Sequence, residues 1–237
     1  MDRLASNVPV RNAATVILVR RAPGDAPGQA RVLMGQRGAG AAFMPNKFVF
    51  PGGAVDPDDF RVPLTTRPDP ICVERLSAGG ADGLADALVA AAIRELWEEA
   101  GLILGRRARW PGDIPEAWQG FADTGHLPDA APLRFVFRAI TPPGRPRRFD
   151  ARFFAVDADA LASRADDFSA ASDELSHLQW VPLDKARGFD LPFITEVVLA
   201  EVAARLPDLS PPASVPFFNN ADEQSLFERL AGRAPLS

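Results

Sequence analysis

Three glutamates stand close together in the stretch Arg94–Leu102, at spacings that gather them on one side of a helix. At about 100° per residue, Glu95, Glu98 and Glu99 fall within an arc of roughly 100° over about one turn. Poorly screened carboxylates this close repel one another by on the order of several kcal/mol. The cluster therefore predicts binding of a cation, and hard divalent metals with oxygen ligands are the natural candidates. The alternative is a solvated acidic helix face.

The opposite side of this predicted helix is apolar. It carries Val89, Ile93, Leu96 and Ala100. A helix with one acidic and one apolar face can dock on a core while presenting its acids. We expect it to begin near Asp82, which is a plausible N-cap, and to end at Gly101, a C-cap residue.

The nine residues from Arg94 to Leu102, RELWEEAGL, match the Arg-Glu half of the Nudix box letter for letter, and Phe50-Pro51-Gly52-Gly53 fits the loop that precedes it. The chain therefore resembles Nudix hydrolases. The resemblance implies an α/β/α sandwich around a mixed β-sheet. It also implies a diphosphatase that uses Mg²⁺ or Mn²⁺ to cleave the pyrophosphate bond of a nucleoside diphosphate linked to another group. Such an ion neutralises the phosphates and activates water, which agrees with the acidic cluster.

The same resemblance gives the site residues their expected roles. Glu98 and Glu99 are expected metal ligands, and Glu95 is a further ligand or the base that activates water. Arg94 is grouped with the catalytic residues, with the expected task of pairing with a carboxylate and orienting it. In the substrate-binding loop, Gly52 and Gly53 allow a sharp turn, and one of their carbonyls completes the metal shell.

The box is interrupted. In the family's box, a glycine is followed after five residues by a glutamate and after seven more by the arginine. Counted from Gly53, the glutamate position holds Asp59, and an unbroken box would place its arginine at position 67. Arg94 therefore lies about 27 residues too late. Asp59, Glu74 or neither supplies the first carboxylate, and the alternative for both acids is exposed charge in an insertion.

An interrupted box resembles one branch of the family, which includes a coenzyme A diphosphatase. Coenzyme A or acyl-CoA is therefore the first substrate to consider, with nucleotide sugars, ADP-ribose and dinucleoside polyphosphates still open. Arg148 and its neighbouring arginines are candidates to receive a phosphate such as the 3′-phosphate of coenzyme A; the alternative is an ordinary soluble surface. Glu174 lies where some family members keep a catalytic or metal-binding acid, and the alternative is a loop acid.

The predicted strands and helices indicate an α/β fold with one elaborated domain, 1–237. We expect a core at about 14–205, an insertion at about 56–80 that sits beside the site, and a C-terminal arm at 207–237. Predicted strands cover 14–19, 31–37, 48–50, 133–140, 152–156 and 178–182. Predicted helices cover 82–100 and 191–205, with a helical turn near 73–76 and a short helix around 115–121.

The resemblance implies a small-molecule nucleoside-diphosphate substrate, and bulk properties argue against nucleic-acid and membrane partners. A net charge of −5 gives no basic surface for nucleic acid. No apolar run approaches the roughly 20 residues of a membrane helix, the N-terminus has no signal-peptide pattern, and the single Cys72 suits a reducing cytoplasm. The arm packs on its own domain or forms a homodimer. The rival to an enzyme is a non-catalytic Nudix-like nucleotide-binding or regulatory module, which would have no need of both Glu98 and Glu99.

Overall fold

The structure of the protein is a computed structural model that describes residues 8–21, 24, 29–41, 43–78, 80–220, 226–230 and 235–236. Most of the N-terminal segment inspected for a signal peptide, residues 1–7, lies outside the described residues. So do three parts of the expected C-terminal arm, at 221–225, 231–234 and 237.

Ten strands of the described residues form one mixed sheet, in the order β12-β11-β10-β7-β8-β1-β2-β3, with β4 beside β1 and β9 beside β2. Their bounds are β1 Val10–Arg20, β2 Arg31–Arg37, β3 Phe48–Val49, β4 Gly52–Ala54, β7 Arg134–Ile140, β8 Arg148–Asp157, β9 Leu175–Pro182, β10 Val215–Asn219, β11 Leu226–Leu230 and β12 Pro235–Leu236. The pairs β1–β8 and β7–β10 are parallel, while β1–β2 is the antiparallel hairpin. A separate two-stranded sheet joins β5 Gly105–Arg107 to β6 His126–Pro128.

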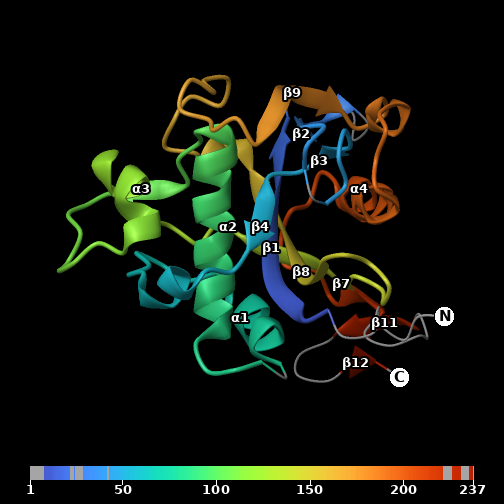
Figure 1. Cartoon of the computed structure of the whole chain (residues 1–237), viewed down its shortest axis with the longest axis horizontal. Helices are drawn as coiled ribbons and strands as arrows, with labels where there is room; N and C mark the ends of the chain where they lie inside the picture. The colour runs from blue at the N-terminus through green and yellow to red at the C-terminus, as the bar shows by residue number, and fades with distance from the viewer. Residues whose placement is uncertain are drawn as a thin grey trace.

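Helices cover both faces of the large sheet, so the predicted α/β/α sandwich is confirmed. The helices α1 Pro70–Ser77 and α2 Leu84–Ala100 share a hydrophobic core with one face, and α4 Phe193–Arg205 packs on the other (Figure 1). The short helix α3 Gln119–Asp123 lies on the outer side of α2 (Figure 1). The site-bearing helix is thus held between the sheet and an outer layer.

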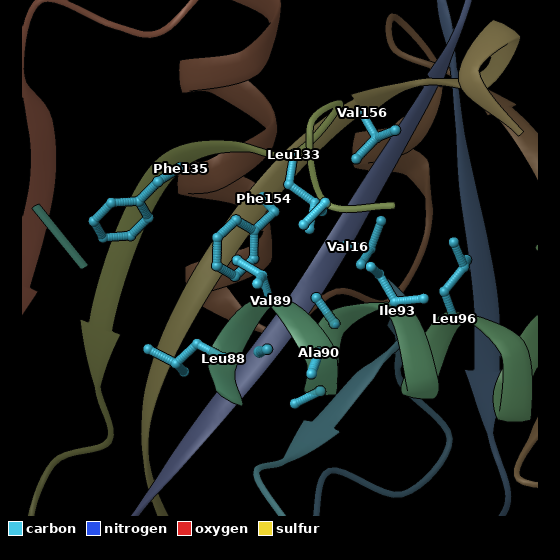
Figure 2. Packing of buried hydrophobic residues seen from close by; sticks show 14 of the residues in the cluster. Val16, Leu88, Val89, Ala90, Ile93, Leu96, Leu133, Phe135, Phe154 and Val156 are labelled. Atoms are coloured by element: carbon cyan, nitrogen blue, oxygen red, sulfur yellow. The ribbon is translucent and has the colours of Figure 1, made fainter. Parts of the chain in front are cut away.

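The central strand β1 explains why two cores form. Val16 and Leu18 point toward α2, whereas Ile17 and Val19 point toward α4, and all four are fully buried. Successive side chains of a strand point to opposite faces, so a continuous apolar run is what a strand buried on both faces requires. Figure 2 shows Val16 facing the apolar side of α2. Each such aliphatic side chain contributes about 1.5–3 kcal/mol on burial.

The ends of α2 are set by two glycines. Gly101 ends the helix as predicted, in the left-handed conformation with φ 69°, and its N–H donates to the carbonyl of Trp97 at 2.8 Å. The helix starts near Asp82 as predicted, but Asp82 is not its N-cap: the N-cap is Gly83 with φ 77°, and no side chain caps the helix. A left-handed residue at that turn suits glycine better than the aspartate before it.

The insertion contains two helical pieces, the 3₁₀ turn η3 Pro57–Arg61 and α1. The single turn predicted near 73–76 is in fact the eight-residue α1, whose Cys72 and Leu76 are buried in the same core as α2. In Figure 1, α1 lies near the N-terminal end of α2, away from the acidic end. Only η3 among these two pieces reaches the acidic part of α2, which limits what the insertion contributes to the site.

The C-terminal arm extends the sheet. Strand β10 pairs in parallel with β7, bringing Phe217 opposite Arg138, and Val215 and Phe217 are buried in the core beneath α1 and α2. The described part of the arm therefore packs on its own domain, and a homodimer stays a prediction. Among the helices of the described residues, none is long and apolar enough to cross a membrane.

Candidate active site

Of the three glutamates of α2, Glu95 and Glu99 lie against strand β4 and are buried. Glu95 is 9 % exposed and Glu99 is 1 % exposed, while the side chain of Glu98 retains 39 % of its exposure. A fully solvated acidic face is therefore excluded. Burying carboxylates is unfavourable unless they gain compensating partners, so the contacts around them decide what the site can do.

Gly52 and Gly53 allow β4 to lie directly against the acids. The N–H of Gly52 donates to Oε2 of Glu99 at 2.7 Å. A Cβ on Gly53 would lie 2.5 Å from Cδ of Glu95, and one on Gly52 would lie 2.5 Å from the carbonyl oxygen of Ala14. The expectation of a sharp turn here is wrong, because both residues belong to a strand that pairs with β1. Because neither residue has a side chain, β4 lies close to β1 at Gly52 and close to α2 at Gly53.

Arg94 joins the acids into one network. Its Nη1 donates to Oε1 of Glu95 at 2.8 Å and to Oε2 of Glu98 at 2.9 Å. Its Nε and Nη2 donate to the carboxylate of Asp59 at 2.9 and 3.1 Å, and Nη2 also donates to the carbonyl of Ala54 at 2.9 Å. These five bonds among the described residues match the five N–H donors of a guanidinium. Arg94 is thus placed to orient carboxylates rather than to contact substrate.

Asp59 fills the first acidic position of the interrupted box. It is 2 % exposed, so the alternative that it is exposed insertion charge is wrong. Counting described residues only, its carboxylate accepts four hydrogen bonds: two from Arg94, one from the indole N–H of Trp118 and one from the backbone N–H of Asp56. A carboxylate offers about four acceptor positions, so Asp59 is saturated as a partner of Arg94. Glu74 lies exposed on α1.

Burial and mutual repulsion raise the pKa values of all three box glutamates. Burial raises the pKa of Glu99 to about 8, assisted by the charge of Glu95, and burial raises that of Glu95 to about 7 against the opposing charge of Arg94. Burial also raises the pKa of Glu98. The Arg94 pKa is raised, because hydrogen bonds and charges from its acidic partners outweigh the effect of burial. The guanidinium therefore remains a permanent cation within the network.

The donor set suits a hard divalent cation. Carboxylates of Glu95, Glu98 and Glu99 and the backbone carbonyls of β4 provide oxygen ligands, the kind that Mg²⁺ prefers. Among the residues that the structure describes, however, no three acidic, His or Cys side chains converge closely enough to form a ready metal cage. Arg94 lies between Glu95 and Glu98, and Glu99 is turned toward Gly52. The fit therefore rests on the chemistry of the ligands.

Of two further predicted site residues, Glu174 lies near the acids and Arg148 does not. Glu174 is exposed just before β9, and its charge contributes to raising the pKa values of all three box glutamates, so it lies beside the site. Arg148 is not brought to the acids. Its register partner on β1 is Val10, four residues or about 13 Å along the strand from Ala14, which pairs with β4. Its buried guanidinium donates to backbone carbonyls of Thr141 and Asn220.

Sequence reasoning missed two residues near the acids. Arg37 at the end of β2 is close enough for its charge to lower the pKa of Glu99 against the effect of burial. Trp118 bonds to Asp59 although 59 residues separate them. Position counting from Gly53 could identify Asp59, but no local pattern marks a tryptophan in a linker as its partner.

Gly53 provides the first test of this packing. We expect Gly53→Ala to lower the turnover rate about tenfold, because the new methyl group displaces the carboxylate of Glu95 from β4. Gly38→Ala is the matched control, since nothing lies within 4 Å of the Cβ that it would add. The measurement is the steady-state rate of each purified variant. Equal rates would mean that close packing of β4 on Glu95 is unnecessary.

Comparison with known proteins agrees with this geometry. The sequence profile of the NUDIX domain matches residues 1–202. The chain belongs to the Nudix family, whose hydrolases cleave pyrophosphate bonds of nucleoside diphosphate derivatives and generally use divalent metals.

Two relatives are informative. A putative nudix hydrolase 7 from Caenorhabditis elegans is 29% identical over 183 residues, covering 72% of this chain and 51% of the relative. The chain thus spans about half the length of that curated relative. The crystal structure of a NUDIX hydrolase from Alicyclobacillus acidocaldarius is 27% identical, with a TM-score of 0.61 over 84% of this chain and 93% of that one.

Proposed function

We propose that the protein is a metal-dependent diphosphatase that cleaves the pyrophosphate bond of a nucleoside diphosphate linked to another group. The observation that carries this proposal is the placement of Glu95, Glu98 and Glu99 together on α2 beneath β4, with Arg94 bonded to two of them. A protein that only binds nucleotides would gain nothing from burying two carboxylates, since their burial costs free energy. In a catalyst, by contrast, these acids would bind the metal and activate water.

In this proposal, Glu98 and Glu99 hold the metal, and Glu95 is either a further ligand or the general base. Bound Mg²⁺ or Mn²⁺ would neutralise the diphosphate and activate water. Glu99 is fixed by the N–H of Gly52, and Glu95 by Arg94, so the acids are aimed before substrate arrives. Glu174, at the rim of the same site, is the second candidate for the base. Arg148 is left out, because its guanidinium is bonded to backbone carbonyls away from the acids.

Coenzyme A or an acyl derivative is the first substrate that we propose, supported by the interruption of the box between Asp59 and Arg94. The experiment is to incubate the purified protein and Mg²⁺ with coenzyme A, acyl-CoA, nucleotide sugars, ADP-ribose and dinucleoside polyphosphates, and to identify products by mass spectrometry. We expect cleavage of at least one compound at its diphosphate. Binding of these compounds without turnover would favour the rival, a nucleotide-binding or regulatory module. The single buried Cys72 suits a reducing cytoplasm as the site of this activity.

Metal binding is tested without substrate. At a metal concentration about 100 times its dissociation constant, Mn²⁺ or Mg²⁺ should stabilise the protein by about 2.7 kcal/mol, raising Tm by roughly 5–10 °C. Glu99→Gln should lose most of this rise, because it removes a charged ligand. Glu196→Gln, an exposed acid in the first turn of α4, is the control and should keep it. Thermal melts with and without a chelator measure the shift, and an unchanged rise in Glu99→Gln would refute the ligand assignment.

A further inference from the structure

A tryptophan outside the box motif is hydrogen-bonded to the network that contains the acids. Trp118 belongs to the 3₁₀ turn η4 Glu116–Trp118, in the linker between β5 and β6, and is 0 % exposed. Its indole N–H donates to Oδ1 of Asp59 at 3.0 Å, the same oxygen that accepts from Nε of Arg94 at 2.9 Å. One carboxylate oxygen thus joins the linker to the catalytic helix.

The linker segment is fixed in place by several contacts. The Trp118 ring packs on Trp110 and Phe121, with ring centroids 6.0 and 5.4 Å apart, and Phe121 packs edge-on against Trp97 of α2 at 6.2 Å. Beside this aromatic group, the backbone N–H of Ala117 donates to the carboxylate of Asp58 at 3.1 Å. The donor at position 118 is therefore pre-oriented toward Asp59 and not free to turn away.

Asp59 stands where the family pattern has a glutamate, and its side chain is one carbon shorter. The acid meets Arg94 through both of its oxygens, a bidentate geometry that tolerates little rotation. The Trp118 bond and the N–H of Asp56 hold one oxygen each, and so fix the plane of the carboxylate. A residue that orients a metal-site partner in this way commonly affects activity about 10- to 100-fold although it never contacts substrate.

We propose that Trp118 is a positioning residue whose indole N–H fixes the carboxylate of Asp59 and thereby the guanidinium of Arg94. Arg94 in turn holds Glu95 and Glu98. The inference rests on the proposed function, since it concerns the same acids. It goes beyond that function by assigning a role in the reaction to the linker that follows α2.

The test compares Trp118→Phe with Trp110→Phe. Both remove an indole donor from the same aromatic group, but Nε1 of Trp110 donates to the carbonyl of His126 at 2.8 Å and not to Asp59. We expect Trp118→Phe to lower kcat about tenfold with KM within about twofold. We expect Trp110→Phe to keep both constants. Equal losses in the two variants, or an unchanged kcat in Trp118→Phe, would overturn the proposal.

A second readout does not depend on activity. In ¹⁵N-labelled protein, the Nε–H resonance of Arg94, assigned by its loss in Arg94→Lys, should move in Trp118→Phe and stay in place in Trp110→Phe. If the wild type cleaves no compound, the proposed function fails, yet this resonance still decides the positioning: a shift supports it and an unmoved signal overturns it. Should Trp118→Phe not fold, benzothienylalanine at position 118 keeps the two-ring shape and removes only the donor.

A double-mutant cycle separates positioning from general packing. If Trp118 acts through Asp59, adding Trp118→Phe to Asp59→Ala, which has no side-chain acceptor, should lower kcat by less than about twofold, because the shared interaction is already lost. A purely structural tryptophan would instead give its full separate loss in both backgrounds. Additive effects would therefore overturn the proposal, while non-additive effects support it.

Discussion

Glu98→Gln should lose diphosphate hydrolysis by at least about 100-fold, as expected when a charged metal ligand becomes neutral. Glu98 is the most exposed of the three acids, and its Oε2 is bonded to Arg94. The substitution keeps the size of the side chain, so we expect the fold to persist with little change in Tm. The measurement is kcat/KM on whichever compound the wild type cleaves.

Glu196→Gln is the matched control, because it makes the same chemical change on α4, away from the acids. It should keep wild-type activity. A Glu98→Gln protein as active as the control would mean that Glu98 does not hold the metal. Restoration of the Glu98→Gln rate by raising the Mn²⁺ concentration would point to a loss of metal affinity rather than of chemistry.

Arg94→Met should be the most destabilising single change at the site. It removes the partner of Asp59, whose side chain is fully buried, and leaves a carboxylate there without a counter-charge. Breaking a buried ion pair on one side costs about 3–5 kcal/mol. For a chain of this size that corresponds to a fall in Tm of roughly 6–20 °C. Arg67→Met, which breaks the exposed ion pair with Asp86, should cost less than about 1 kcal/mol.

Adding Asp59→Asn to Arg94→Met separates stability from catalysis. The double variant no longer buries an unpaired charge, so part of the lost Tm should return. Its activity should stay low, because nothing then orients Glu95 and Glu98. Recovery of both quantities would show that Arg94 serves stability alone. A wild-type Tm for the single variant would show instead that Asp59 finds another partner or is protonated.

Local patterns in the sequence predicted much of the fold. The continuous apolar run of β1, the alternation of apolar residues in β7 and the two faces of α2 are local patterns, which depend only on near neighbours. Boundaries were less predictable. Strand β8 begins at Arg148 and not at Arg152, because it continues to pair with β1 as far back as Val10. The arm's strands depend on pairing with distant β7, which no local pattern encodes.

The Arg94–Leu102 stretch by itself determined the family, the helix and the acidic face, because all nine residues are contiguous and fix their own spacing. The tertiary structure decided what that face becomes. Glu95 and Glu99 are buried because β4 has no side chains at Gly52 and Gly53 to keep it away.

The partners of Arg94 were likewise decided only by packing. Asp59 lies 35 residues from Arg94, and Trp118 lies 59 residues from Asp59, yet one carboxylate oxygen accepts from both side chains. Separations of that length are closed by the packing of η3 and η4 against each other and of η3 against α2, which is a property of the whole core. A sequence states which residues can do chemistry, and long-range contacts determine which of them meet.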